Sequence, residues 1–329
     1  MDVLVTGATG FIGGHLARRL AEQGHRVRVL VRRAVPTLET LGMVPYRGDV
    51  RRPASLRMAV AGAQVIYHLA ALRDCCDVPW SHCYTVNVAG TEHLLDAAAK
   101  AGVERFVYCS SVGVARAPGQ RDADETLPYL APTSQVAYHR SKAEAEQLVL
   151  DAARENRIAA VGVRPVITYG PEDETGMVTR LLTLVAHRHF LMIGDGKNHL
   201  DLAYIDDVVD GMVLAAERGK SGRVYILSSP QPRPMREIAD LAGRVTHCEV
   251  PPFHVPVWAA RTAAGTVEKV WRLLGRRPPL TRDAVATLTV DRGFSHMRAQ
   301  TELGYRPQVN LEDGFQRTAA WLRAEDRIS

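Results

Sequence analysis

The chain has 329 residues, of which 46% are hydrophobic and 23% charged, enough apolar surface for one large domain or two closely joined ones. Ordinary glycine and proline contents give no sign of a fibre or a disordered chain. The net charge of +5 is spread along the sequence, whereas a nucleic-acid-binding protein would concentrate it in a basic stripe with interleaved aromatics.

The N-terminal residues 2–31 are predicted to form a strand–helix–strand unit. Residues 2–6 form a short β-branched run that ends at glycines, and residues 11–24 carry apolar side chains four apart before stopping at a glycine. Residues 25–31 again read as a strand. This order predicts a βαβ unit that opens a parallel sheet.

Three glycines lie in the turn between the first strand and the first helix. Gly7, Gly10 and Gly13 are three apart in "TGATGFIGG". Glycines allow a tight turn and a close approach of the backbone to a pyrophosphate, and the helix N-terminus offers unpaired N–H groups. The alternative is a glycine-rich turn that binds no ligand, but the position of the three glycines in a βαβ unit favours dinucleotide binding.

The end of the second strand indicates which dinucleotide is bound. Sites for NAD place an acidic residue about 20 positions after the glycines, to bond the ribose 2′-hydroxyl. Here Val31 holds that place and is followed by Arg32 and Arg33. An arginine can bind a 2′-phosphate that a carboxylate would repel. We therefore expect NADP(H) to be preferred, with NAD(H) possible.

Strands and helices continue to alternate along the chain. Strands are expected at 63–71, 105–111 and 157–165, with helices over 87–102 and from near Ser134. This alternation predicts an α/β fold of the Rossmann type, a doubly wound parallel sheet. Proline clusters then predict a smaller, irregular C-terminal substrate lobe. The expected division assigns 1–165 to dinucleotide binding, with 206–229 rejoining it through a strand at 223–229, and 166–205 with 230–329 to the lobe.

Tyr138 and Lys142 lie four apart in "YHRSK" and so share one face of the helix. An ammonium group beside a tyrosine stabilises the phenolate and lowers the tyrosine pKa, so Tyr138 could exchange a proton with a carbonyl or alcohol oxygen. Ser111 could hydrogen-bond the same oxygen. A half-buried tyrosine with a solvated lysine, and Ser110 and Ser111 as loop residues, are the ordinary alternatives.

Taken together, these motifs resemble the extended short-chain dehydrogenase/reductases, of the NAD-dependent epimerase/dehydratase superfamily. "TGATGFIG", "GDV", "HLAA", "NVAGT", "CSS", "YHRSK", "RPVITYGP" and "YIDDVV" occur in the order of that branch and cover most of the chain. The resemblance implies an enzyme in which Ser111, Tyr138, Lys142 and Asn87 are catalytic and Lys142 also holds the nicotinamide ribose. It further implies a set of cofactor-binding residues: Gly7, Thr9, Gly10, Phe11, Ile12, Gly13, Arg32, Arg33, Asp49, Val50, Leu69, Ala70, Ala71, Tyr138, Lys142, Pro165, Val166 and Ile167.

The substrate is indicated by "GDGKNHLDLAYIDDVV". Many nucleotide-sugar enzymes of the branch place an arginine where this chain has Leu200, which offers no donor to a phosphate, and the adjacent His199 is usually neutral at pH 7. This stretch and residues 276–322 look like the 3β-hydroxysteroid dehydrogenase and sterol-4α-carboxylate 3-dehydrogenase group. We expect interconversion of a secondary alcohol and a ketone on a hydrophobic sterol- or lipid-like molecule. A long-chain 2-alkyl-3-oxoalkanoate and a flavonoid ketone are related possibilities.

Two other functions stay open. One is a nucleotide-sugar epimerase, dehydratase or reductase, although Val112 and Gly113 supply no acidic residue beside the serine, as a dehydratase would usually need. The other is a non-catalytic NADP(H)-binding regulator, against which the intact tyrosine–lysine pair argues.

Residues 255–277 predict a basic amphipathic helix. Val267, Val270, Trp271 and Leu274 follow the i, i+3, i+4, i+7 pattern, and basic residues outnumber acidic ones. Packing of this stripe on the substrate lobe is favoured over peripheral contact with a membrane.

The five cysteines are odd in number and form no C-x-x-C pair, so neither a disulfide framework nor a metal site is expected. No secretion signal and no apolar run of about 20 residues is seen, which favours a reducing cytoplasm. A small molecule, not a nucleic acid, is the expected partner. The family resemblance implies a homodimer.

Overall fold

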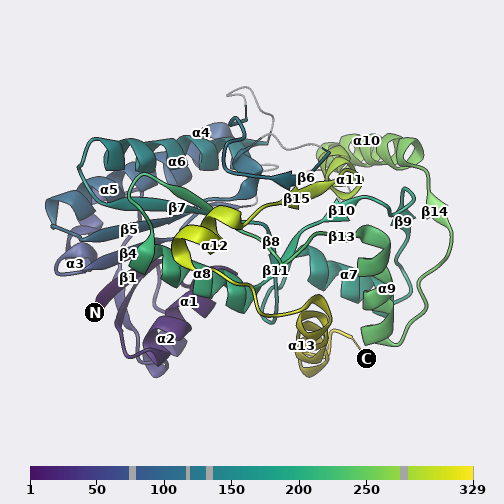
Figure 1. Cartoon of the computed structure of the whole chain (residues 1–329), viewed down its shortest axis with the longest axis horizontal. Helices are drawn as coiled ribbons and strands as arrows, with labels where there is room; N and C mark the ends of the chain where they lie inside the picture. Colours follow the sequence, from purple (N-terminus) through teal and green to yellow (C-terminus); the bar gives the residue numbers. More distant parts are fainter. Residues whose placement is uncertain (74–78, 116–118, 131–135, 275–280, 329) are drawn as a thin grey trace.

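The computed structural model describes residues 1–73, 79–115, 119–130, 136–274 and 281–328. Its centre is a parallel sheet of seven strands, in the order β12-β7-β5-β4-β1-β2-β3 (Figure 1). The strands are β1 (Asp2–Thr6), β2 (Arg26–Val31), β3 (Val44–Arg47), β4 (Val65–His68), β5 (Arg105–Cys109), β7 (Ala160–Pro165) and β12 (Val224–Leu227). The predicted Rossmann-type fold is therefore confirmed, and the strand expected at 223–229 pairs with β7.

Helices cover both faces of this sheet. One face packs against α3 (Arg57–Val60), α5 (Gly90–Lys100) and α6 (Ala137–Arg154), and the other against α1 (Phe11–Glu22) and α8 (Ile205–Arg218). Side chains of β1 alternate between the two layers: Leu4 belongs to the first core, whereas Val3 and Val5 belong to the second. This alternation is the period of two that a strand buried on both faces requires.

The strand order reverses direction between β1 and β4. From β1 the chain moves outward to β2 and β3, and it then returns to β4 on the other side of β1. The loops that follow β1 and β4 diverge at this point and leave a crevice at the carboxyl ends of the strands. Such a switch point is where doubly wound sheets bind ligands.

The rest of the chain forms a smaller lobe beside the carboxyl ends of the sheet (Figure 1). A four-stranded sheet has the order β13-β10-β15-β6, and two-stranded sheets pair β11 with β8 and β14 with β9. The strands are β6 (Gln120–Ala123), β8 (Ile167–Tyr169), β9 (Met192–Ile193), β10 (His199–Leu200), β11 (Leu202–Tyr204), β13 (Arg233–Pro234), β14 (His254–Val255) and β15 (Arg292–Phe294). The helices are α7 (Met177–Ala186), α9 (Met235–Thr246), α10 (Val257–Leu273), α11 (Arg282–Leu288), α12 (Met297–Leu303) and α13 (Leu311–Ala324).

Short helical pieces complete the described chain. These are α2 (Pro36–Thr40), α4 (Trp80–Cys83), the 3₁₀ turns η1 (Pro53–Ser55) and η3 (Val112–Val114), and the π-helix η2 (Tyr84–Ala89). Of the predicted helix over 87–102, the first turn thus belongs to η2. The predicted start of the following helix near Ser134 lies outside the described residues, and α6 begins at Ala137. None of the described helices is long and apolar enough to cross a membrane.

The stripe predicted over 255–277 does not pack as a unit. Ala260 and Ala264 are the buried residues that α10 contributes to a small core with Val285 of α11. Val267 and Trp271 are half-buried, whereas Val270 and Leu274 of the same stripe are exposed. The expectation that this stripe packs on the lobe was therefore wrong for Val270 and Leu274, whereas Val267 and Trp271 lie on the same helix face as the buried Ala260 and Ala264.

Candidate active site

The glycine turn after β1 has the geometry of a phosphate cradle. Gly7 has φ +78°, and a Cβ placed there would lie 2.7 Å from the Ala70 nitrogen. A Cβ at Gly13 would lie 2.2 Å from the Gly7 carbonyl oxygen. Gly10 caps α1 without a side-chain hydrogen bond, so no side chain occupies the first-turn N–H groups at this cap. These observations fit a dinucleotide pyrophosphate at the α1 N-terminus.

A cavity of about 1110 Å³ opens at this turn and brings most of the predicted site residues together. Its lining extends from the glycine turn, past the ends of β4 and β5, to the start of α6 and the segment that joins β7 to β8. The predicted residues in this lining are Gly7, Thr9, Gly10, Phe11, Ile12, Gly13, Leu69, Ala71, Ser111, Tyr138, Lys142, Pro165, Val166 and Ile167.

Tyr138 and Lys142 both line the cavity from the first two turns of α6. The Lys142 ammonium is buried, donates a hydrogen bond to the Cys109 carbonyl oxygen and lies 4.3 Å from the centre of the Tyr108 ring. Burial lowers the pKa of Lys142 to about 8, while Cys109 and Glu146 oppose this shift. The ammonium is thus held by the end of β5 and remains largely charged at neutral pH.

Two serines follow β5, and both line the cavity. The Ser111 hydroxyl accepts a hydrogen bond of 3.1 Å from the Gly113 N–H and so caps η3. Its proton remains available to an oxygen in the cavity. The Ser110 hydroxyl is buried and has no hydrogen-bond partner among the described residues. We keep Ser111 as the predicted substrate contact.

Asn87 does not line the cavity, but it links two segments that do. Its side-chain oxygen accepts a hydrogen bond of 2.6 Å from the Leu72 N–H, and its amide nitrogen donates to the Leu72 carbonyl and, at 2.8 Å, to the Ser141 hydroxyl. It therefore ties the loop after β4 to α6, next to Lys142.

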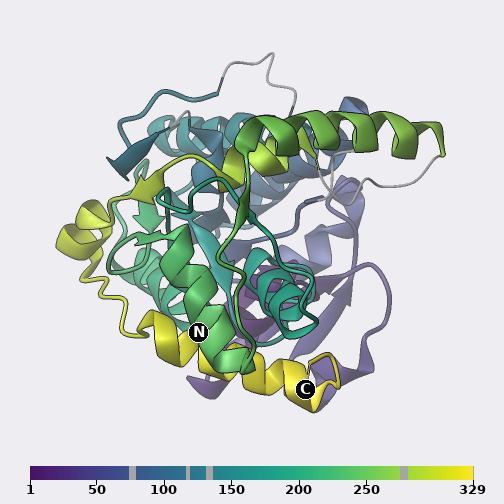
Figure 2. The ribbon, with the colours of Figure 1, turned by 90° about the vertical axis from the view of Figure 1, so that its right-hand side faces the viewer.

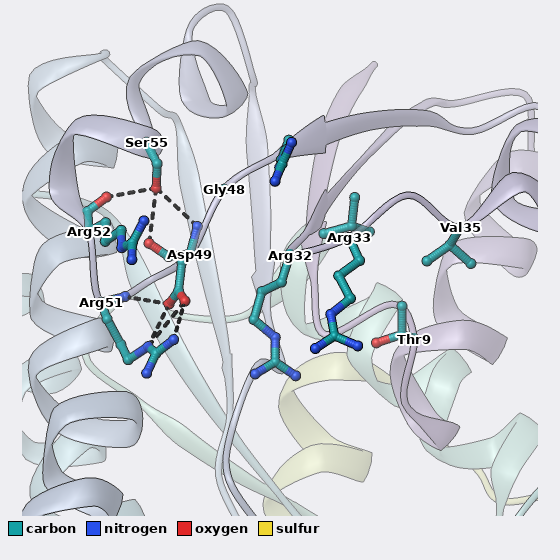
Figure 3. Close-up of a pocket in the computed structure, with 11 residues that line it drawn as sticks. Thr9, Arg32, Arg33, Val35, Gly48, Asp49, Arg51, Arg52 and Ser55 are labelled. Carbon is teal, nitrogen blue, oxygen red and sulfur yellow. Dashed lines mark hydrogen bonds and ion pairs between the residues drawn. The ribbon is translucent and has the colours of Figure 1, made fainter.

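A second cavity, of about 840 Å³, adjoins the first at Thr9. Five arginines line it, together with Asp49 and Ser55: Arg32, Arg33, Arg47, Arg51 and Arg52. Figure 3 shows the Arg32 and Arg33 side chains extending together between Asp49 and Thr9. Asp49 is paired with Arg51 at 2.6 Å, which lowers the pKa of the Asp49 carboxyl. The pocket as a whole favours an anion.

Two predicted cofactor residues do not line either cavity. The Ala70 N–H donates to the Thr6 hydroxyl, and Val50 is buried against Gly90 of α5. Both support the cavity walls from behind. Leu200 is also buried; it lies in β10 and lines neither of these two cavities but a third, smaller one together with Arg233 and Asn310. The neighbouring His199 donates its backbone N–H to the Asp291 carboxylate at 2.7 Å, and its ring Nδ1 lies 3.3 Å from the same oxygen.

Residues of the site that the sequence did not single out are mainly buried polar groups. Asp173 lines the large cavity, and burial raises the pKa of its carboxyl. Glu146, one turn beyond Lys142, is fully buried and paired with Arg164 at 2.6 Å. The spacing of Glu146 from Lys142 was a signal for this contact, because residues four apart share a helix face. No comparable spacing points to Asp173.

The NAD dependent epimerase/dehydratase family model matches residues 3–228. The chain belongs to this family. The match includes the glycine turn, Tyr138, Lys142 and every strand of the central sheet. The resemblance to the extended short-chain dehydrogenase/reductases is thus confirmed, and the chain is an oxidoreductase-type enzyme of that family.

Relatives of this family member include reductases and dehydrogenases. A 2-alkyl-3-oxoalkanoate reductase of Stenotrophomonas maltophilia is 33% identical, over 97% of this chain and 99% of its own length. A 3β-hydroxysteroid-dehydrogenase/decarboxylase isoform 1 of Arabidopsis thaliana is 32% identical, over 96% of this chain and 78% of its own. The crystal structure of gox2253 superposes with a TM-score of 0.83 at 32% identity and covers 100% of this chain and 99% of that one.

Proposed function

We propose that this enzyme is an NADP(H)-dependent oxidoreductase that interconverts a secondary alcohol and a ketone on a hydrophobic, sterol- or lipid-like substrate. The observation that carries the proposal is one cavity in which Tyr138, Lys142 and Ser111 face the space beside the glycine turn. The names of the relatives, a 2-alkyl-3-oxoalkanoate reductase and a 3β-hydroxysteroid-dehydrogenase/decarboxylase, support a hydrophobic substrate that carries a ketone or an alcohol.

The proposed roles follow from the chemistry of the side chains. When ketone is reduced, the Tyr138 hydroxyl gives its proton to the carbonyl oxygen, and in the reverse direction the phenolate takes a proton from the alcohol. Ser111 donates a hydrogen bond to that oxygen and orients it. The buried Lys142 ammonium stabilises the phenolate. The nicotinamide, when bound, supplies or accepts the hydride that balances this proton.

The basic pocket supports NADP(H) over NAD(H). Arg32 and Arg33 are exposed in it, whereas the carboxylate of Asp49, the acid in its lining, is already paired with Arg51. A 2′-phosphate placed there would meet paired N–H donors. Leu200 supports a substrate without a pyrophosphate, since its buried side chain offers no donor to a phosphate.

Turnover measured at the nicotinamide absorbance tests the proposal. The purified enzyme is supplied with NADPH or NADH and with sterol-type ketones, 3-oxoalkanoates or nucleotide sugars. We expect reduction of the apolar ketones with NADPH, and a fall in kcat of at least about 100-fold for Tyr138→Phe. Tyr84→Phe, at an exposed tyrosine, is the matched control. Turnover of nucleotide sugars alone would refute the substrate class, and full activity of Tyr138→Phe would refute the mechanism.

A further inference from the structure

The helix α10 carries an apolar face that the described part of the chain leaves exposed. Trp258 is 73% exposed, Leu273 88% and Leu274 62%, and Val270 is exposed as well. At 3.6 residues per turn these four side chains fall within an arc of about 160° around the helix axis. We call them the exposed apolar face of α10.

The opposite side of α10 is the side that packs. Ala260 and Ala264 are buried against Val285 on that side, whereas Gly265, which lies beside Trp258 at one margin of the exposed face, approaches the Arg282 guanidinium. The exposed apolar face therefore points away from α11. Figure 2 shows α10 lying along one edge of the molecule, with its C-terminal half extending past the body.

Positive charge accompanies this face. Lys269 lies within the same arc, Arg261 lies about 60° outside it on the side of Trp258, and both are exposed. Glu268 is the one acidic residue of α10, and it accepts a hydrogen bond of 2.7 Å from the Arg282 N–H. Its carboxylate is thereby directed toward α11.

A second apolar group lies at the base of the helix. β14 pairs in parallel with β9, which places Phe253 and Leu191, the residues just before these strands, at the same end of the pair. Phe253 is 62% exposed and Leu191 51%. This group precedes Trp258 in the chain and lies at the N-terminal end of α10.

We propose that the exposed apolar face of α10 docks on a lipid bilayer that contains anionic headgroups. An exposed apolar stripe with a tryptophan and flanking arginine and lysine is the arrangement of helices that lie in the membrane interface. Charge selects this occupant over a second copy of the chain. In a two-fold dimer the same surface would meet itself, and Arg261 and Lys269 of both copies would come together. Anionic lipid instead supplies the opposite charge.

Sedimentation with vesicles tests this docking independently of any turnover. The full chain is mixed with vesicles of phosphatidylcholine alone, or of phosphatidylcholine with 30% phosphatidylglycerol. We expect binding to the anionic vesicles, weaker binding to the neutral ones, and weakening by 0.5 M salt. The variant Trp258→Ser/Leu273→Ser should bind the anionic vesicles at least about tenfold more weakly.

The control variant is Met58→Ser/Met297→Ser, which changes two equally exposed apolar side chains outside α10. It should bind as the wild type does, and thermal unfolding checks that both variants are folded. Equal vesicle binding by wild type and the α10 variant would overturn the proposal, as would no binding by the wild type. A solution dimer that the α10 variant alone dissociates would assign the face to a second copy instead.

Discussion

Arg32 and Arg33 follow Val31, which stands at the end of β2 where an acid would select NAD. Both are exposed and line the basic pocket. Because hydrogen bonds to charged groups contribute about 1.5–3 kcal/mol each, losing one to a 2′-phosphate weakens binding by roughly 10- to 150-fold. NAD(H) carries a neutral hydroxyl in place of the 2′-phosphate, so its binding should not weaken in this way.

We therefore predict that Arg32→Ala raises the KM for NADPH by at least about tenfold and changes the KM for NADH less than threefold. Steady-state kinetics with both cofactors measure this. Arg57→Ala, an exposed arginine of α3 outside the pocket lining, is the matched control and should leave both values unchanged. A similar rise for the two cofactors would show that Arg32 contacts something they share.

At the scale of single elements, α6 aligns three residues of the site. Tyr138, Lys142 and Glu146 are four apart, so they follow one face of the helix. Glu146 is fully buried, accepts a hydrogen bond of 2.6 Å from the Tyr129 hydroxyl and is paired with Arg164. Its charge raises the pKa of Lys142 against the effect of burial. Glu146 is thus a positioning residue that acts through Lys142.

We predict that Glu146→Gln shifts the alkaline limb of the pH–rate profile to lower pH, because the Lys142 ammonium loses a favourable charge. The variant also leaves the buried Arg164 without its partner, which should cost about 3–5 kcal/mol of unfolding free energy. In Glu146→Gln/Arg164→Met most of that stability should return, while the alkaline limb stays shifted.

The matched control for this pair is Glu144→Gln in the same helix, where the carboxylate is half-buried and paired with Arg140 at 3.0 Å. Chemical denaturation and pH–rate profiles distinguish the two effects. If the double variant regains the wild-type alkaline limb together with its stability, then Glu146 acts on folding alone and not on Lys142.

Most strands of the central sheet were predictable from the sequence, because their burial between two layers of helices requires apolar side chains at most positions. β1, β2, β4 and β5 lie within the predicted ranges because strands buried on both faces need unbroken apolar runs. The glycine turn and the Tyr138–Lys142 pair were found because local spacing alone brings those residues together. Asp173 and Arg164 could not be found in this way, since contacts between distant segments bring them to the site.

α10 shows the limit of periodicity more directly. The sequence pattern favours Val267, Val270, Trp271 and Leu274, but the fully buried contacts lie two turns earlier on the face of Val267 and Trp271, at Ala260 and Ala264. Small residues allow two helices to approach closely, and this gain is not visible in an apolar count. The apolar residues left over are those that we propose to meet a membrane.

At the scale of the whole molecule, buried histidines set the response to acid. His68 bridges the Thr6 and Thr91 hydroxyls at 2.7 and 2.9 Å, and burial lowers its pKa to about 3. Burial also lowers the pKa of His139 to about 4. Between these values and about pH 6.5 the unfolded chain binds protons that the folded protein does not, so stability falls as the pH falls through this window.

Carboxyls whose pKa burial raises work in the opposite direction: Glu125, Asp173, Asp201, Asp207 and Asp210. Asp201 accepts hydrogen bonds from Ser229 and Phe294 across the joint between β10, β12 and β15, and burial raises its pKa to about 6. The folded protein therefore binds a proton at Asp201 before the unfolded chain does, which adds stability as the pH falls from about 6 to 3.8. Burial lowers the pKa of His15, His25 and His296 as well as those of His68 and His139, and the unfolded chain protonates all five near pH 6.5. Between pH 7 and pH 5 we therefore expect the net effect of acid to be destabilising.

We predict that the free energy of unfolding falls between pH 7 and pH 5, and that the fall is about 2 kcal/mol smaller in His68→Gln. This variant has no imidazole to protonate on unfolding, although it is less stable at pH 7 because it loses the bridge between Thr6 and Thr91. Urea denaturation at the two pH values measures the difference. His254→Gln, at an exposed histidine, should keep the wild-type fall. An unchanged fall in His68→Gln would mean that other groups carry the acid response and that the imidazole at position 68 is already protonated in the folded protein at pH 5.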